Sequence, residues 1–354
     1  MLCSIGVEYS IGIYNTHVDY VNNQYTPTNG FGKLIASING PKGQALHVAY
    51  CSGIGNTTSN NYCFATCGEK HVTFWNLSGS HKGMKIKEDK GSLGSANRSK
   101  TYLSLARLAD DQIIVGTTDG DLMCFNSKRI LLPVSSSSNG GHTGSVNTLW
   151  VNSTGTLLLS GSSDCTVIAW TIPSSANITT NTNGKGKNME SPHLLPIKIS
   201  FFKLSENLMN SVCPSIPSDN ASIRTKELSV RSVCMSPDGN KIIMGTQGCQ
   251  VLECSTPSSF NNTGNNTTTN TNNTTSTTVL EVIPILSELR LIVTGHYKKE
   301  LWGLDIRPPK GGNTSDANSG DSEFCTVGDD CYLRVWSVQK KKMLRSIYLG
   351  APAR

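Results

Sequence analysis

Two sets of side chains in this sequence combine a histidine, a hydroxyl group and an aspartate, which are the three groups of a nucleophilic catalytic triad. The sets are His142, Ser160 and Asp164, and His296, Thr326 and Asp330. A catalytic triad is recognised by its geometry and by the role of each group, so the residue types alone do not establish one. What surrounds these residues decides between catalysis and structure.

A tryptophan completes each set at a fixed distance. The hydroxyl precedes the aspartate by four residues, the tryptophan follows it by six, and a Gly-His pair leads each segment; the tryptophans are Trp170 and Trp336. This spacing is typical of a WD repeat, which forms one blade of a β-propeller. In such a blade the indole N–H donates to the hydroxyl, and the hydroxyl and the aspartate bond the histidine. Each link satisfies a buried polar group that would cost roughly 1–3 kcal/mol if left unpaired. The sequence therefore predicts two structural networks inside sheets, and no catalytic site.

Weaker copies of the pattern recur along the chain. The predicted repeats lie near residues 1–15, 46–76, 102–126, 141–172, 230–255 and 295–337. Phe125 stands in for the tryptophan in the third repeat, and the fifth has neither the aspartate nor the tryptophan. We expect the repeats without the full set to depend on apolar packing between neighbouring sheets. In the fourth repeat both alternating faces of the run 167–170 are apolar, which is expected of a sheet covered on both sides.

The repeats predict an all-β fold: a WD-repeat β-propeller over residues 1–349, with about six to seven blades of four-stranded antiparallel sheet. The first blade is expected to be incomplete, because Met1 falls where its second strand should begin. We expect upstream sequence to complete it; an open ring or a second chain are the alternatives. The run 343–348 is the last expected strand.

Four polar segments separate the repeats. They span residues 174–191, 205–222, 255–278 and 311–323, and they are rich in serine, asparagine, threonine and glycine. Such segments bury too little apolar surface to fold, so they are predicted to be disordered surface loops.

Composition limits the possible functions. The chain has 354 residues, 16 % of them charged, and a formal net charge of +6, which is too small to indicate nucleic-acid binding. Its 12 cysteines form no Cys-x-x-Cys pair, and most lie in apolar runs that favour small buried thiols over a zinc site. No apolar stretch approaches the ~20 residues of a membrane span, and the N-terminus lacks the basic flank of a signal peptide. We expect a monomeric cytoplasmic protein that uses no cofactor or metal and does not bind membranes.

Three segments carry a resemblance to a known family. They are Thr66–Gly79 (TCGEKHVTFWNLSG), Val230–Val233 (VRSV) and Gly295–Leu304 (GHYKKELWGL). The Glu-Leu-Trp-Gly-Leu run after Gly-His and the shortened turn before Phe74-Trp75 are the most specific parts. The chain resembles the echinoderm microtubule-associated protein-like family over nearly its whole length apart from the insertions. The resemblance implies the first of two tandem atypical propellers, without its opening blade, and implies binding to tubulin or microtubules.

The sequence and this resemblance lead to one expected function and one alternative. The expected function is a non-catalytic scaffold of the cytoskeleton that binds tubulin or microtubules; the alternative is a general interaction propeller with a different protein partner. Because the tubulin surface is acidic, basic clusters are the candidate contact residues. One cluster is expected in a loop region (Lys82, Lys85, Lys87, Lys90, Arg98, Lys100), and the other is expected to flank the last strand (Lys340, Lys341, Lys342, Arg345). An enzyme is the third and least favoured class, because no paired carboxylates, histidine cluster or nucleophile motif is present.

Overall fold

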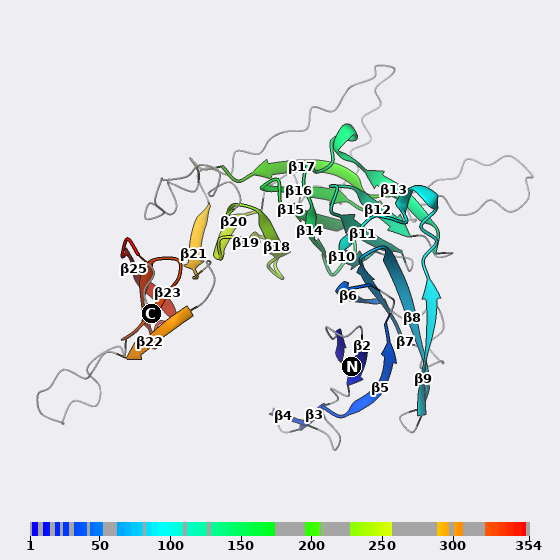
Figure 1. Ribbon diagram of the computed structural model, residues 1–354, viewed down its shortest axis with the longest axis horizontal. Coiled ribbons are helices and arrows are strands. Elements are labelled where there is room, and N and C mark those ends of the chain that lie inside the picture. Colours follow the sequence, from blue (N-terminus) through cyan, green and yellow to red (C-terminus); the bar gives the residue numbers. More distant parts are fainter. Residues whose placement is uncertain are drawn as a thin grey trace, which may run out of the picture. The chain divides into compact units, whose positions relative to one another are not determined.

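A computed structural model describes most of the repeats (Figure 1). The described residues are 2–5, 10–14, 18–21, 24–27, 32–40, 43–51, 62–80, 83–108, 112–125, 129–173, 195–205, 208, 227–256, 289–296, 301–306 and 323–351. The chain divides into two compact units. One comprises Met1–Asp164 and Ile168–Ile199, and the other comprises Cys165–Val167 and Ser200–Arg354.

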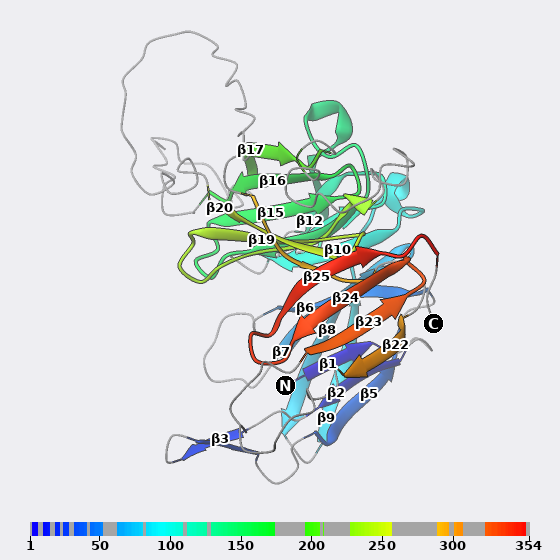
Figure 2. The same cartoon turned by 90° about the vertical axis from the view of Figure 1, so that its left-hand side faces the viewer.

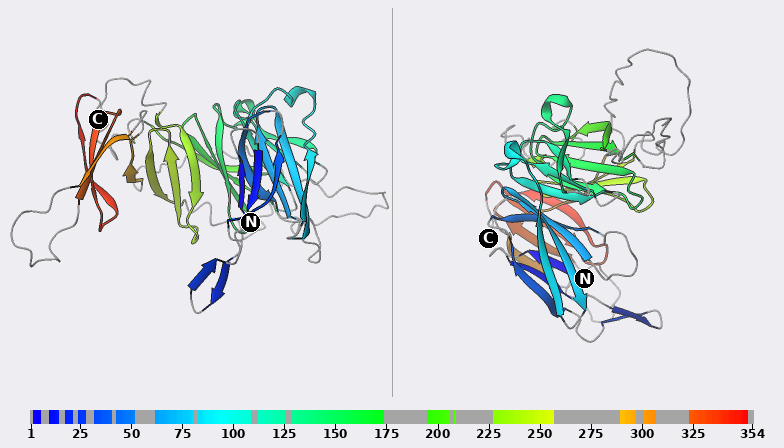
Figure 3. Two further views of the ribbon diagram at one scale, coloured as in Figure 1. Left: turned by 60° about the horizontal axis from the view of Figure 1, so that its bottom comes forward. Right: turned by 90° about the vertical axis from the view of Figure 1, so that its right-hand side faces the viewer.

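The first sheet has three strands in the order β1-β2-β5. These are β1 (Leu2–Ile5), β2 (Ser10–Tyr14) and β5 (Leu34–Asn39), and both pairings are antiparallel. Between β2 and β5 the chain forms a separate hairpin of β3 (Val18–Val21) and β4 (Gln24–Pro27), visible as the small blue pair of strands in Figure 3 (left). The first predicted repeat therefore gives a sheet with one strand fewer than the sheets that follow.

Two four-stranded antiparallel sheets come next, each with its strands in chain order. The earlier sheet contains β6 (Ala45–Cys51), β7 (Tyr62–Gly68), β8 (His71–Ser80) and β9 (Gly83–Lys90). The later sheet contains β10 (Tyr102–Arg107), β11 (Ile113–Thr117), β12 (Leu122–Phe125) and β13 (Leu131–Ser135). Short 3-10 helices η1 (Ser95–Asn97) and η2 (Ser137–Asn139) lie in the connections before β10 and after β13.

Three more four-stranded sheets complete the described part. The first contains β14 (Val146–Val151), β15 (Leu157–Ser162), β16 (Thr166–Thr171) and β17 (Ile197–Lys203). The second contains β18 (Val230–Met235), β19 (Lys241–Thr246), β20 (Gln250–Ser255) and β21 (Arg290–Thr294). The third contains β22 (Leu301–Ile306), β23 (Glu323–Gly328), β24 (Tyr332–Ser337) and β25 (Lys342–Tyr348). Figure 2 shows β22 to β25 side by side. The predicted last strand is confirmed as β25.

Burial follows the sheet stacking within the first unit. The residues of β11 and β12 are buried on both faces, because apolar side chains of neighbouring sheets cover each face. One cluster joins Cys67, Val72 and Phe74 to Tyr102 and Val115 of the next sheet, together with further buried residues of both. Another cluster joins Ile11 and Ile13 of the first sheet to Trp75 and Leu77. Within the first unit, these three neighbouring sheets are therefore joined by apolar contacts.

The turn between the second and third strand of each four-stranded sheet contains a residue with left-handed backbone. These residues are Lys70, Gly120, Cys165, Cys249 and Cys331, with φ between 58° and 91°. Side chains with a Cβ rarely adopt this conformation. Its recurrence at one turn, in residues of different type, shows that sheet geometry and not residue preference sets the backbone there.

The predicted loops fall largely outside the described residues. The predicted loop 174–191 lies entirely outside them. Of the other three loops only residues 205, 208, 255–256 and 323 are described, and two of these are wrong as loop positions: Ser255 is the last residue of β20 and Glu323 is the first of β23. Each pairs with a neighbouring strand, so the sheet extends one residue into each predicted loop.

Candidate functional site

The predicted network of the fourth repeat is present around Ser160. Trp170 Nε1–H donates to Ser160 Oγ at 2.9 Å, and His142 Nε2 lies 2.8 Å from the same oxygen. His142 Nδ1 lies 3.3 Å from Asp164 Oδ2, which also accepts a hydrogen bond from the Thr143 backbone N–H at 2.8 Å. Since a carboxylate can only accept, we assign the histidine proton to Nδ1, and Ser160 then donates to Nε2.

This geometry excludes nucleophilic catalysis at Ser160. His142 and Ser160 are both 0 % exposed, and the hydroxyl already accepts the indole N–H. A catalytic hydroxyl must reach a substrate, and this one lies inside the sheet stack. The contacts fix β15, β16 and the segment that leads into β14, so their role is structural.

The sixth repeat carries the same network with an added cation. Trp336 Nε1–H donates to Thr326 Oγ1 at 2.8 Å, His296 Nε2 lies 2.9 Å from that oxygen, and His296 Nδ1 lies 2.7 Å from Asp330 Oδ1. Arg334 Nη1 donates to the second oxygen of Asp330 at 2.7 Å. The sequence reasoning missed Arg334, which stands four residues after the aspartate, where the fourth repeat has Ile168.

Charge around Asp330 keeps it ionised. Burial by itself raises the pKa of the Asp330 carboxyl, but hydrogen bonds from His296 and Arg334 lower it by more, so the pKa lies below its usual value. The Arg334 guanidinium also lies over the Tyr332 ring, 5.0 Å from its centroid. Asp330 therefore stays ionised and serves as the hydrogen-bond acceptor for both His296 and Arg334.

The second repeat, which is among those expected to depend on apolar packing, keeps one hydrogen bond of the network. Trp75 Nε1–H donates to Thr66 Oγ1 at 3.0 Å, and both residues are buried. The two residues are nine apart, whereas ten residues separate the matching pairs of the fourth and sixth repeats. The turn is shorter by one residue, but the link between the third strand and the second is kept.

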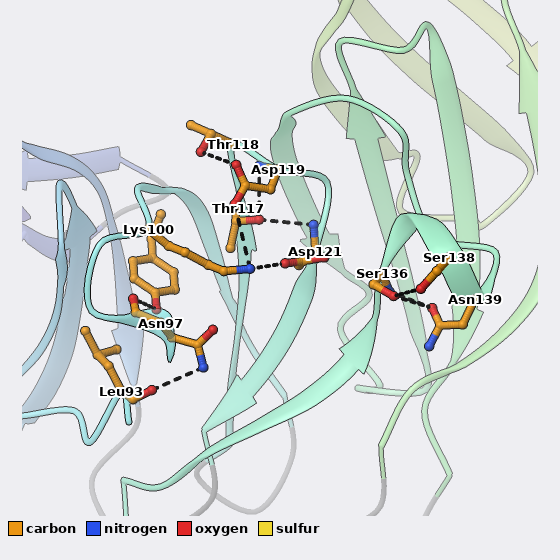
Figure 4. Close-up of polar contacts among 11 residues, drawn as sticks. Leu93, Asn97, Lys100, Thr117, Thr118, Asp119, Asp121, Ser136, Ser138 and Asn139 are labelled. Carbon is orange, nitrogen blue, oxygen red and sulfur yellow. Dashed lines mark hydrogen bonds and ion pairs between the residues drawn. The ribbon is translucent and has the colours of Figure 1, made fainter. Parts of the chain in front are cut away.

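The third repeat has a different polar cluster, shown in Figure 4. Lys100 forms an ion pair with Asp121 and lies 3.7 Å from Asp119. Thr117 Oγ1 accepts the backbone N–H groups of Asp119 and Asp121, which fixes the turn between β11 and β12. Asp119 stands where Asp164 stands in the next repeat, so a lysine here replaces the histidine as its partner.

The first basic cluster lies mainly on a strand and not in a loop, so that prediction is corrected. Lys85, Lys87 and Lys90 belong to β9, the outer strand of its sheet, which pairs with β8 along its whole length. The strand was hidden in the sequence because both of its faces carry charges. Lys82 lies outside the described residues. In the second cluster Lys340 and Lys341 lie in the exposed tight turn between β24 and β25, and Lys342 is the exposed first residue of β25.

Most cysteines in the described residues are buried or partly buried. Cys63, Cys67, Cys124, Cys165 and Cys254 are buried, and burial raises the pKa of the Cys124 thiol to about 12. Cys234 is exposed, contrary to the expectation for apolar runs. Among the described residues, no three His, Cys, Asp or Glu side chains are grouped to hold a metal ion, and no helix is long and apolar enough to span a membrane.

Comparisons with known proteins agree with the repeat architecture. The family model for the WD domain, G-beta repeat, matches residues 134–171, which contain the complete His142 network. A curated human protein, echinoderm microtubule-associated protein-like 2, is 22 % identical over 291 residues, which is 82 % of this chain and 31 % of the relative. The chain thus spans about a third of the length of that relative.

Solved structures are similar to this chain at low sequence identity. One is the β-propeller domain of Cps50 (Swd1) from Myceliophteria thermophila, with a TM-score of 0.45 and 12 % identity over 72 % of this chain and 64 % of that chain. Another is Sqt1 from Chaetomium thermophilum, with a TM-score of 0.44 and 11 % identity over 97 % and 69 %. The strand order of the sheets and the family model over the fourth repeat identify a WD-repeat β-propeller fold, and the chain is similar over most of its length to echinoderm microtubule-associated protein-like 2.

Proposed function

We propose that this protein is a non-catalytic scaffold that binds tubulin or microtubules. The observation that carries the proposal is its similarity, over 82 % of the chain, to a human protein whose name describes it as microtubule-associated. A cytoplasmic location at the cytoskeleton follows from the proposal. The buried position of Ser160 and its bond to Trp170 support a non-catalytic role for the one trio that most resembles a catalytic triad.

The charge distribution supports an acidic partner. Lys85 and Lys87 are exposed on β9, and three consecutive lysines, Lys340 to Lys342, are exposed where the turn after β24 leads into β25. Tubulin is acidic, and complementary charge speeds encounter and selects partners. These two lysine groups are the proposed contact residues.

Co-sedimentation with stabilised microtubules tests the proposal. Purified, folded protein should pellet with microtubules at low salt and pellet less at physiological ionic strength, because salt screens contacts between exposed charges. Absence of pelleting at both salt concentrations would contradict microtubule binding. A propeller that instead binds a different protein would fit the alternative of a general interaction platform.

A further inference from the structure

Among the described residues, the hairpin of β8 and β9 extends past the pairing of β7 with β8. The pairing of β7 with β8 begins at Tyr62 and Leu77, whereas β8 continues to pair with β9 through Ser78, Gly79 and Ser80. Among the described residues, β9 pairs on one side only, with β8. Its outer edge therefore presents backbone N–H and C=O groups that another strand can use.

Charges on β9 are unequally compensated on its two faces. On one face Lys90 lies 3.7 Å from Glu88. On the other face Asp89 is already used by Arg129, at 3.8 Å, and Lys85 and Lys87 follow along the same face. Within the part of the chain that the structure describes, neither of these two lysines has an acidic partner.

The surroundings of these lysines are polar. In the register of β8 and β9, Lys85 stands opposite Ser78 and Lys87 opposite Asn76. Ser78 is exposed and Asn76 is half-buried, so no apolar surface stands between the two cations and solvent. A ligand at this place would be held by backbone pairing and by charge.

We propose that the outer edge of β9 binds an extended acidic segment of a partner protein, which adds to the sheet as a fifth strand. In an added strand, side chains on one face recur every two residues, about 6.8 Å apart, which matches the spacing of Lys85 and Lys87. Acidic residues at alternate positions would face the two lysines. The inference rests on the proposed function for the identity of the partner, because it assigns the surface that the acidic partner contacts.

The same lysines also explain selectivity at an exposed edge. Lysine on an edge strand opposes pairing with neutral or basic strands, which protects the protein from aggregation. An acidic strand is instead attracted by the two lysines. The lysines therefore disfavour pairing with most strands and favour pairing with acidic ones.

A peptide experiment tests the proposed edge. A short labelled peptide with glutamate at alternate positions is compared, by fluorescence anisotropy at low salt, with a peptide of equal charge interrupted by two prolines. The Lys85→Gln/Lys87→Gln double variant is compared with Lys90→Gln, which alters the opposite face of the same strand. We expect the double variant to bind the alternating peptide about tenfold more weakly, since two exposed ion pairs are lost. Lys90→Gln should bind as wild type does, and thermal melts should show all three proteins folded.

Two results would overturn the proposal. Equal binding of the proline-interrupted peptide would show attraction by charge without strand addition. Unchanged binding by the double variant would show that Lys85 and Lys87 do not contact the peptide. Microtubule pelleting separates this inference from the proposed function. If wild type pellets and the double variant pellets equally, the assignment to β9 fails and the function stands. If wild type does not pellet but binds the alternating peptide through Lys85 and Lys87, the edge stands and the microtubule function fails.

Discussion

Arg334 donates from Nη1 to Asp330 Oδ2 at 2.7 Å, and the arginine is only 1 % exposed. Thr326 and Arg334 are paired across β23 and β24, so the guanidinium lies beside the hydroxyl that receives Trp336. In the fourth repeat Ile168 occupies the matching position, four residues after the aspartate. The sixth repeat thus contains a buried ion pair where the fourth contains an apolar contact.

Replacing Arg334 with methionine should destabilise the second unit. The substitution leaves Asp330 buried with one strong partner, His296, and loss of one member of a buried ion pair costs about 3–5 kcal/mol. The measurement is chemical denaturation of wild type and Arg334→Met at neutral pH. Ile168→Met, the matched change in the fourth repeat, should cost less than about 1.5 kcal/mol. Equal effects of the two substitutions would show that the ion pair adds nothing to stability.

The pH dependence of stability should reflect the Asp330 carboxyl. Its folded pKa is depressed by His296 and Arg334, so its contribution is fully present above the unfolded pKa, about 3.9, and is lost as pH falls through the folded pKa. As the pH falls below 5, the free energy of unfolding of wild type should therefore decrease more than that of Asp330→Asn. Urea denaturation of both proteins at a series of pH values measures the two free energies. Parallel curves for the two proteins would contradict the lowered pKa.

The hydroxyl of Ser160 should be essential to the fourth repeat. Ser160→Ala leaves the Trp170 indole N–H and His142 Nε2 without their shared partner, and a buried unsatisfied group costs about 1–3 kcal/mol. Ser160→Thr keeps the hydroxyl, as Thr66 and Thr326 do at the matching positions, and should be much milder. Denaturation of both variants gives the comparison. A threonine variant as unstable as the alanine variant would place the effect in packing and not in the hydrogen bonds.

The parts of the fold that were predictable are those with fixed spacing and buried side chains. His142, Asp164 and Trp170 can be recognised in the sequence because each needs a polar partner at a fixed sequence spacing, and the strands between them are apolar. Arg334 was missed because its position accepts isoleucine in the fourth repeat, so the residue type signals nothing until the register of β23 and β24 places it beside Asp330.

The outer strands were the least predictable elements. β9 carries charges on both faces, and β25 is exposed or half-buried throughout, because an outer strand packs against few neighbours. β13 even contains Pro133, which a sheet tolerates at its edge. Alternation of apolar and polar residues arises from burial of one face, so a strand with little burial leaves little pattern. The lysines of β9 therefore looked like part of a loop.

Gly116 should be needed for contact between two neighbouring sheets of the first unit. A Cβ at this position of β11 would lie 2.6 Å from Val146 Cβ and Cγ1 and 2.7 Å from Ser104 Oγ. Ser104 in turn donates to the Val146 carbonyl at 2.9 Å, so the valine backbone is held and cannot easily retreat. Gly116→Ala should destabilise by about 1–3 kcal/mol through overpacking. In the Gly116→Ala/Val146→Ala double variant the two costs should be somewhat less than additive, because alanine at position 146 removes the contact with Cγ1 and keeps only the contact with Cβ. Thermal or urea denaturation of the four proteins in this cycle measures the coupling, and strict additivity would show that the two residues do not oppose each other.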